Sequence, residues 1–375
     1  MSLRPKRGIA RLKTCAHGGI HQLKDAELKA LGIDTNNILD FSVSTNPFMP
    51  PPGTKEKMGA AFIEQYPDSQ STELRQRLSG RLGLAPENIL VGSGTTELIR
   101  LIAFAYFRQG DYVLLLEPTY GEYEVACQLT GARPLKHRAR ESDNFAPRTE
   151  EVVDIIRKRQ PRAVFICNPN NPTGLYLSRR EIETVLKATD DSLLILDEAY
   201  VTFVEKRWDP FDLIEQGNVV VLRSMTKDYG LPGLRLGYAV ARREIIDSLR
   251  PVLPPWNVNA IAQKVGVDVL EKEEYLRQSL RQVREAKRFL TDELSLLGFK
   301  VLPSDANYFL VKVGHALECR HSLLRQGILV RDCTSFGLKE YIRIAPRTMP
   351  ECQILIAAIT KIFRSGEDIV SDRGK

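Results

Sequence analysis

The chain of 375 residues contains no apolar run long enough to cross a membrane, so we expect no membrane partner. Its first residues are basic, but no apolar stretch follows them, which argues against a secretory signal. The six cysteines are widely scattered and form no Cys-x-x-Cys pair. This pattern predicts reduced thiols in a cytoplasmic protein and no metal site. Internal repeats and low-complexity tracts are also absent.

Charge of one sign is not concentrated in any long segment. The net charge of +6 is spread along the chain, which fits anionic small substrates without requiring them. The basic start of the chain could touch nucleic acid or an acidic neighbour. We interpret it as a solvated tail and predict no nucleic-acid partner.

Short apolar runs alternate with helical patterns between about residues 54 and 245. This alternation predicts an α/β fold with a mostly parallel sheet between helices, in which ligands bind at the carboxyl ends of the strands. The expected strands are Ile89–Val91, Tyr112–Leu116, Pro134–Arg138, Ala163–Cys167, Leu193–Leu196, Val219–Leu222 and Gly237–Val240.

The remaining patterns predict a smaller α+β domain. A long helix from about Glu271 to Leu297 carries one apolar stripe, and a capping box at Thr348 opens a final helix at about 350–364. A further helix is expected from about Gln22 to Leu31. We therefore predict an N-terminal arm (1–50) that joins the small domain (271–364), a large domain (51–270) and a polar tail (365–375).

One lysine follows a buried strand in a hydroxyl-rich turn. The segment from Ser224 to Lys227 continues from the strand Val219–Leu222, and a buried lysine can form an imine with an aldehyde. Ser224, Thr226 and Arg235 could bind a phosphate beside it. An aldehyde with a phosphate tail describes pyridoxal phosphate. Taken alone this motif is weak, because loop lysines are usually solvated.

Further polar segments follow the other expected strands. Gly94-Thr95 opens a helix and could bind phosphate through free backbone N–H groups, or could be a plain turn. Tyr120 could lie over a planar ring, or could be a buried aromatic residue. Asp197 could pair with a pyridinium N–H, which would offset the cost of burying its charge, or could cap the next helix.

Four motifs occur in a fixed order. They are Asn-Pro-Asn-Asn-Pro-Thr-Gly (168–174), Asp-Glu-Ala-Tyr (197–200), Ser-x-Thr-Lys (224–227) and Gly-Leu-Arg-x-Gly-Tyr (233–238). Together they resemble the fold-type I pyridoxal-phosphate enzymes, of the aspartate aminotransferase-like fold with a seven-stranded sheet. The most similar branch holds histidinol-phosphate aminotransferase and L-threonine-O-3-phosphate decarboxylase, and the resemblance covers about residues 15 to 363.

The resemblance implies a role for each matching residue. Lys227 would be the catalytic Schiff-base lysine, Asp197 the pyridinium partner and Tyr200 a ligand of the ring hydroxyl. The other cofactor ligands would be Gly94, Thr95, Tyr120, Asn171, Ser224, Thr226 and Arg235, with Tyr66 reaching across from the second subunit of a homodimer. The substrate ligands would be His17, Gly18, Ser44, Asn171, Arg331 and Arg343.

The N-terminal arm favours one of the two reactions. Ala16-His17-Gly18-Gly19 is similar to the decarboxylase pattern, in which this segment folds over a substrate phosphate, although His17 could also be an ordinary surface residue. Ser44 departs from that pattern, because the decarboxylases usually have Asn there. We therefore expect decarboxylation of O-phospho-L-threonine to (R)-1-amino-2-propanol phosphate in cobalamin biosynthesis, hence a phosphorylated amino acid or amino alcohol as substrate.

Two alternatives remain open. The first is transamination of histidinol phosphate with 2-oxoglutarate, or a related transamination, which would use nearly the same site. The second is a cofactor-binding regulator that has lost catalysis, against which the presence of Lys227, Asp197 and both substrate arginines argues. No helix-turn-helix extension is evident for such a regulator.

Overall fold

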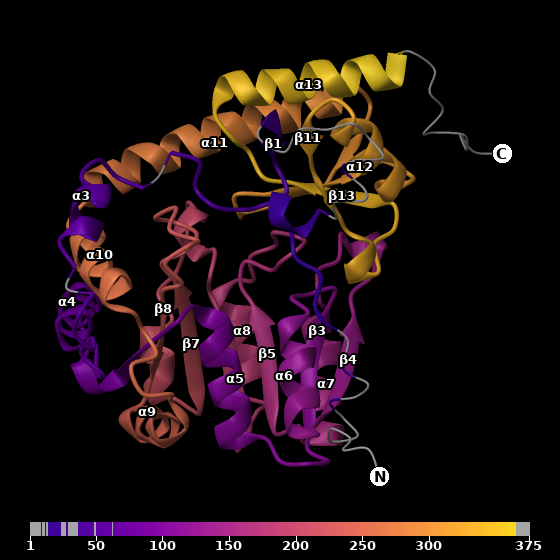
Figure 1. Ribbon diagram of the computed structural model, residues 1–375. Helices are drawn as coiled ribbons and strands as arrows, with labels where there is room; N and C mark the ends of the chain where they lie inside the picture. Colours follow the sequence, from indigo (N-terminus) through magenta and orange to yellow (C-terminus); the bar gives the residue numbers. More distant parts are fainter. Residues whose placement is uncertain are drawn as a thin grey trace, which may run out of the picture.

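The computed structural model describes residues 9, 12, 14–23, 28, 37–48, 50–61 and 63–364. The described part of the chain contains a seven-stranded sheet, a four-stranded sheet and a two-stranded pair (Figure 1). The expected helix at about 22–31 lies largely outside the described residues, and the tail 365–375 lies wholly outside them.

The seven-stranded sheet has the order β2-β8-β7-β6-β5-β3-β4. Its strands are β2 (Ile89–Gly92), β3 (Tyr112–Glu117), β4 (Arg133–Arg138), β5 (Ala163–Cys167), β6 (Leu193–Asp197), β7 (Val219–Ser224) and β8 (Gly237–Ala241). Only β8 runs against its neighbours, and its first residue, Gly237, pairs with the last residues of β2 and β7, Gly92 and Ser224. The loop before β8 therefore reaches the edge where the other strands end.

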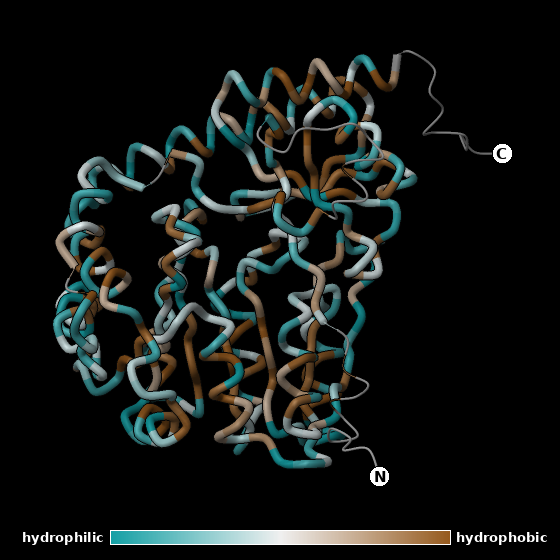
Figure 2. Tube along the Cα trace, viewed as in Figure 1, coloured by the Kyte–Doolittle hydropathy of each residue, from teal (hydrophilic) through white to brown (hydrophobic). Residues whose placement is uncertain are grey.

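Helices cover both faces of this sheet. They are α3 (Thr54–Gly59), α4 (Thr72–Leu82), α5 (Thr95–Tyr106), α6 (Glu122–Thr130), α7 (Thr149–Arg159), α8 (Arg179–Leu186), α9 (Arg243–Leu249) and α10 (Ala260–Leu270). Alternate strand residues enter two separate cores: Val219 and Val221 pack with α4, α7, α8 and α10, whereas Val220 and Leu222 pack with α5, α6 and α9. The central strands are consequently apolar along their length (Figure 2).

The second, smaller unit is built on the sheet β12-β13-β10-β9. It contains β9 (Lys300–Val301), β10 (Phe309–Lys312), β11 (Ile328–Leu329), β12 (Arg331–Asp332) and β13 (Tyr341–Ile344), with α11 (Glu273–Leu296), α12 (Ala316–Leu324) and α13 (Met349–Arg364). In Figure 1, α11 and α13 lie together along the top of the molecule. The N-terminal strand β1 (Leu39–Asp40) pairs in parallel with β11, so the arm contacts this unit.

The predicted fold class is confirmed, since the sheet is mostly parallel and lies between helices. Half of the predicted capping box at Thr348 is present: the amide and hydroxyl of Thr348 donate to Glu351 Oε2 over 3.0 and 2.6 Å, and the hydroxyl does not serve as acceptor for the Glu351 amide. Helices α3, α9 and α10 were not predicted from the sequence, and the proposed domain boundaries stay a prediction. Within the described ranges, no helix is long and apolar enough to span a membrane.

A buried ion pair supports the end of the sheet. Arg223 on β7 donates to Glu198 Oε2 from Nε at 2.7 Å and from Nη2 at 2.6 Å. The Glu198 side chain is fully buried and directly follows Asp197, so this pair braces the end of β6. Burial raises the pKa of Glu198 and the positive charge of Arg223 opposes that rise.

Replacing Arg223 with methionine should lower the free energy of unfolding by about 3–5 kcal/mol, because the buried carboxyl of Glu198 would lose its cationic partner. Urea denaturation of the purified protein measures the change. The exposed variant Arg243→Met is the control. Adding Glu198→Gln to Arg223→Met should recover part of the loss. Equal stability of Arg223→Met and wild type would contradict this account of the pair.

Candidate active site

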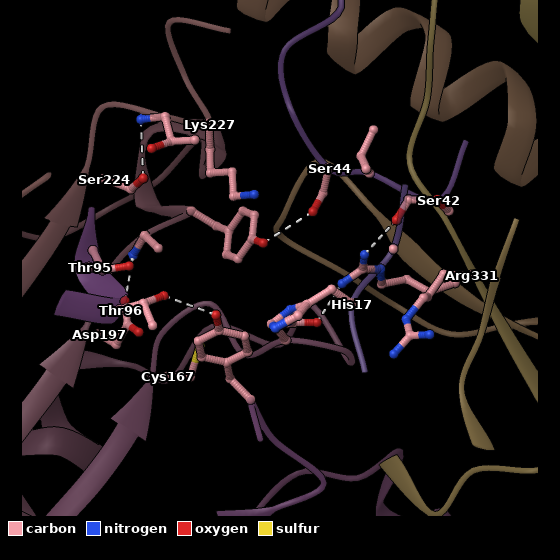
Figure 3. Close-up of a pocket in the computed structure, with 18 of the residues that line it drawn as sticks. His17, Ser42, Ser44, Thr95, Thr96, Cys167, Asp197, Ser224, Lys227 and Arg331 are labelled. Atoms are coloured by element: carbon pink, nitrogen blue, oxygen red, sulfur yellow. Dashed lines mark hydrogen bonds between the residues drawn. The ribbon is translucent and has the colours of Figure 1, made fainter. Parts of the chain in front are cut away.

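A pocket lies at the edge of the seven-stranded sheet where most of its strands end (Figure 3). Of the predicted site residues, the following line it: His17, Gly18, Ser44, Thr95, Tyr120, Asn171, Asp197, Tyr200, Ser224, Thr226, Lys227, Arg235, Arg331 and Arg343. They come from the arm, the large sheet and the small unit. The edge of an α/β sheet is the usual location of a ligand site in such folds.

Lys227 lies on the loop after β7 and its side chain projects into the pocket (Figure 3). Its Nζ lies 5.9 Å from the centre of the Tyr200 ring. The backbone of this loop is fixed by Asn46, whose amide donates to the Lys227 carbonyl over 2.8 Å and whose Nδ2 donates to the Asp228 carbonyl over 3.0 Å. The same Nδ2 donates to Ser279 Oγ on α11 over 2.8 Å.

Asp197 ends β6 and is only 2% exposed. Its carboxylate accepts hydrogen bonds from the Tyr123 hydroxyl at 2.7 Å and from the Ala199 amide at 3.1 Å. Burial raises the pKa of Asp197, and these two hydrogen bonds oppose the rise. No Lys or Arg of the described chain forms an ion pair with it, so a cationic ligand beside it would relieve the cost of its burial.

An anion cradle lies beside Lys227. Thr95 is the first residue of α5, and the backbone N–H groups at a helix start attract anions. Gly94 has φ 81°, and a Cβ there would approach Arg235 Nη2 to 2.8 Å, so glycine admits the guanidinium. Ser224 and Thr226 complete the lining. One guanidinium, two hydroxyls and a helix start suit a phosphate.

Three polar residues surround the centre of the pocket. The Tyr120 hydroxyl lies 3.2 Å from Thr96 Oγ1, and burial raises the pKa of Tyr120. Tyr200 accepts a hydrogen bond from Ser44 Oγ at 3.1 Å, so the serine is long enough to reach this hydroxyl. Asn171 Oδ1 accepts from Arg343 Nη1 at 2.5 Å, which joins the large sheet to the small unit across the pocket.

Two arginines of the small unit face the same space. Arg343 is buried, and its Nη2 donates to the Ser42 carbonyl over 2.8 Å, while its Nε has no partner among the described residues. Arg331 donates from Nη2 to the Ala16 carbonyl over 2.8 Å. Burial lowers the pKa of Arg331, and the nearby positive charge of Arg343 lowers it further. An anionic ligand would offset this repulsion.

The arm closes one side of the pocket. Nε2 of His17 lies 3.5 Å from Glu122 Oε1 at the start of α6. A Cβ on Gly18 would approach the Ser42 carbonyl oxygen to 2.6 Å, so the absence of a side chain permits close packing of the arm. The Gly19 amide donates to Ser42 Oγ over 2.8 Å.

Two predicted residues do not line this pocket: Gly94, which packs against the guanidinium of Arg235, and Tyr66. Tyr66 is 79% exposed and stacks on Trp256, with ring centres 4.3 Å apart. Sequence reasoning also missed Tyr123, which holds Asp197. Its spacing of three residues from Tyr120 was the available signal, because residues three apart at a helix start can lie on one face. The two rings meet edge to face at 5.5 Å.

Comparison with known families decides the class of protein. The sequence pattern of the family described as aminotransferase class I and II matches residues 36–359. The chain belongs to this family. Its members depend on pyridoxal phosphate, and the cradle, the uncompensated Asp197 and the lysine loop fit that cofactor.

Two curated relatives of this aminotransferase-family chain are both histidinol-phosphate aminotransferases. The histidinol-phosphate aminotransferase of Ruminiclostridium cellulolyticum is 32% identical over 85% of this chain and 90% of the relative. That of Moorella thermoacetica is 34% identical over 89% and 87%, respectively. The expectation of threonine-phosphate decarboxylation is therefore wrong. It depended on the short motif at His17, whereas the anchors in the pocket suit both reactions.

Solved structures show the same fold. The histidinol-phosphate aminotransferase of Sinorhizobium meliloti, in complex with pyridoxal-5'-phosphate, superposes with a TM-score of 0.86 at 22% identity, over 97% of this chain and 99% of that one. The L-threonine-O-3-phosphate decarboxylase of Porphyromonas gingivalis gives 0.76 at 28% identity, over 87% of this chain and 100% of that one. The fold is thus shared by both kinds of enzyme.

Proposed function

We propose that this protein transfers the amino group of histidinol phosphate to 2-oxoglutarate, reversibly, as a histidinol-phosphate aminotransferase. The observation that carries the proposal is the set of curated relatives of that name, 32–35% identical over most of the chain. The pocket supports it, because a phosphorylated amine and a dicarboxylate both need cationic anchors, and Arg331 and Arg343 face the cavity together.

The cofactor, when bound, withdraws electrons from the substrate carbon and carries the amino group between the two half-reactions. Thr95, Ser224, Thr226 and Arg235 would hold its phosphate, and Tyr120 would lie against its ring. Asp197 would face the ring nitrogen and keep it protonated. Asn171 and Tyr200 would contact the ring hydroxyl.

Lys227 would hold the cofactor through its Nζ and then move the proton at the substrate carbon. A short, tethered loop suits this work, because proton transfer requires a donor within hydrogen-bond reach. Asn46 supplies the tether through the Lys227 and Asp228 carbonyls. Tyr200, whose hydroxyl accepts from Ser44, lies beside this amine, with its ring centre 5.9 Å from Lys227 Nζ.

Arg331 and His17 would bind the substrate phosphate, with Gly18 beside His17 and Ser44 deeper in the pocket at Tyr200. Arg343 would bind the carboxylate of the amino-acid partner, since its buried Nε has no partner among the described residues while Nη1 is held by Asn171. A carboxylate accepts two parallel hydrogen bonds from a guanidinium, which orients the amino acid as well as binding it. Histidinol phosphate and the amino-acid partner would therefore bind in the same site, one after the other.

Offering the purified holoenzyme histidinol phosphate with 2-oxoglutarate tests the proposal, and we expect glutamate to form. O-Phospho-L-threonine without an oxo acid is the comparison, and we expect no CO2 from it. Omitting 2-oxoglutarate from the first reaction should limit conversion to one equivalent per site. Release of CO2 from phosphothreonine, or absence of glutamate, would overturn the proposal.

We also propose a homodimer in the cytoplasm. Tyr66 and Trp256 stack on each other and are both exposed, and exposed apolar groups of this kind mark an interaction surface in many proteins. Tyr66 would reach the cofactor phosphate of the partner subunit. All six cysteines are free, as in a reducing compartment. Sedimentation of wild type and Tyr66→Ala measures the assembly.

Tyr123 should act as a positioning residue for Asp197. Replacing it with phenylalanine removes a hydrogen bond to a buried carboxylate, so turnover should fall by about tenfold or more. That hydrogen bond stabilises the ionised form of Asp197, so its loss raises the pKa of the carboxyl. The ionised form is then lost at a higher pH as pH falls, and the acid limb of kcat/KM should move upward.

A pH profile of the Tyr123→Phe enzyme distinguishes this role from a structural one, because lost packing alone would lower activity without moving the acid limb. Tyr106→Phe, on the neighbouring helix α5, is the control. An unchanged profile in Tyr123→Phe would contradict the positioning role.

A further inference from the structure

Three possible metal ligands meet at the entrance of the pocket. They are Cys15 and His17 of the arm and Glu122 at the start of α6, with one ligand atom from each lying within 4.8 Å of the others. His17 lines the pocket and is labelled in Figure 3. Cys15 and His17 are two residues apart, but Glu122 is more than a hundred positions away, so the spacing of the cysteines alone gave no sign of the cluster.

The packing around Cys15 is specific. Gly121 has φ −66° and ψ −18°, a backbone conformation that any residue adopts, so its glycine is not needed for the turn. A Cβ at this position would instead lie 2.8 Å from Cys15 Sγ. The missing side chain therefore lets the thiol dock against the start of α6, next to Glu122.

Neighbouring groups orient the other two ligands. The Glu122 side chain is only 7% exposed, and its Oε2 accepts from Arg100 Nη2 at 3.0 Å, which leaves Oε1 for His17. Arg331 holds the carbonyl of Ala16, the residue between Cys15 and His17, at 2.8 Å. Partners of this kind in an outer shell fix the direction in which ligand atoms point.

We propose that Cys15, His17 and Glu122 form a site for a thiophilic divalent cation, zinc being the model ion, and that its occupation holds the arm across the pocket. One sulfur, one imidazole nitrogen and one carboxylate oxygen, with a fourth position open to water, is a donor set that zinc accepts. A thiolate and a carboxylate would together neutralise its charge.

The separations agree with this geometry. Two nitrogen or oxygen ligands about 2.0–2.1 Å from a tetrahedral zinc lie roughly 3.3–3.4 Å apart. Nε2 of His17 and Oε1 of Glu122 are 3.5 Å apart, which is long for a direct hydrogen bond. Sulfur and nitrogen or oxygen ligands of one tetrahedral zinc lie roughly 3.6 Å apart. The thiol lies within 4.8 Å of both other ligand atoms, so it would have to close by no more than about 1.2 Å.

The site has a consequence for turnover. His17 is also the residue that would meet the substrate phosphate, so an ion on its imidazole removes that contact. The bound ion would also tie the arm to α6 and keep the pocket entrance closed. Zinc should therefore inhibit the enzyme, and a chelator should restore it.

Equilibrium dialysis of the holoenzyme against zinc, without substrate, measures the binding directly. We expect about one ion per chain, and an absorption band typical of a thiolate when cobalt replaces zinc. Cys15→Ser and Glu122→Gln should each weaken zinc binding by at least about tenfold. Changes to residues that only orient a metal ligand already weaken binding by about tenfold or more, so loss of a ligand should cost at least as much. The matched controls are Glu124→Gln, on the same helix, and His21→Asn, on the same arm.

Two results would overturn the site: no zinc bound by the wild type at micromolar concentrations, or equal binding by wild type, Cys15→Ser and Glu122→Gln. Inhibition is assayed separately, relative to the zinc-free activity of each variant. If zinc binds through Cys15 and Glu122 but turnover is unchanged, the metal site stands and the proposed closure of the pocket is wrong. Because dialysis needs no substrate, failure of the proposed transamination would not affect the binding result.

Discussion

Replacing Lys227 with alanine is expected to lower transamination by about 10⁴-fold, the upper range for removal of a group that transfers a proton. The physical reason is that, under the proposed function, one amine would have two tasks, holding the cofactor and moving the proton at the substrate carbon. The described chain offers no second amine in this pocket, since Lys227 is its one lysine lining residue. Initial rates of glutamate formation measure the loss.

A second measurement separates this role from a loss of folding. Borohydride should fix the cofactor on wild type in a form stable to denaturation, and should fix none on Lys227→Ala. Lys264→Ala, an exposed lysine on α10, serves as the control and should match the wild type in both assays. Retained covalent labelling in Lys227→Ala would show that another lysine carries the cofactor.

Replacing Asp197 with asparagine is expected to lower turnover by about 10²–10³-fold, a loss typical of a removed electrostatic group in an enclosed site. Asparagine has nearly the same shape, so Tyr123 and Ala199 keep a partner while the negative charge is lost. Without that charge the ring nitrogen would lose its proton more readily, and the cofactor would withdraw electrons less well. Steady-state kinetics and the absorption spectrum of the bound cofactor both report the change.

Asp154→Asn, an exposed carboxylate on α7, is the matched control and should leave kinetics unchanged. Loss of cofactor affinity alone would raise the cofactor concentration needed for full activity. Loss of the electrostatic role would persist at saturating cofactor. Full turnover of Asp197→Asn at saturating cofactor would contradict the electrostatic role of Asp197.

Strand ends were the part of the site most open to prediction. Asp197, Asn171 and Lys227 each follow an apolar run, and the carboxyl ends of parallel strands share one edge of a sheet. Each residue could therefore be recognised from its neighbours in the sequence, and the expected fold predicted that these residues lie close together. The arm was harder, because short patterns such as that at His17 do not report which bond of the substrate is aligned for cleavage.

Contacts between distant segments could not be foreseen in the same way. Arg343 and Asn171 lie 172 positions apart, and their hydrogen bond depends on how the small unit docks on the sheet. The helix α10 was missed because its apolar residues surround it and include several valines and Gly266, so neither the helical nor the strand period stands out. Tyr123 was passed over because only one aromatic residue of its segment was considered.

Asn46 has a consequence for how far the chain could be shortened. It precedes every strand of the seven-stranded sheet, yet its amide and side chain fasten the loop that carries Lys227 to helix α11. A truncated protein that began after Pro47 would keep the whole sheet and both cores, but its reactive amine would sit on an unanchored loop. We therefore expect that a minimal active version of this chain has to include the segment around Asn46.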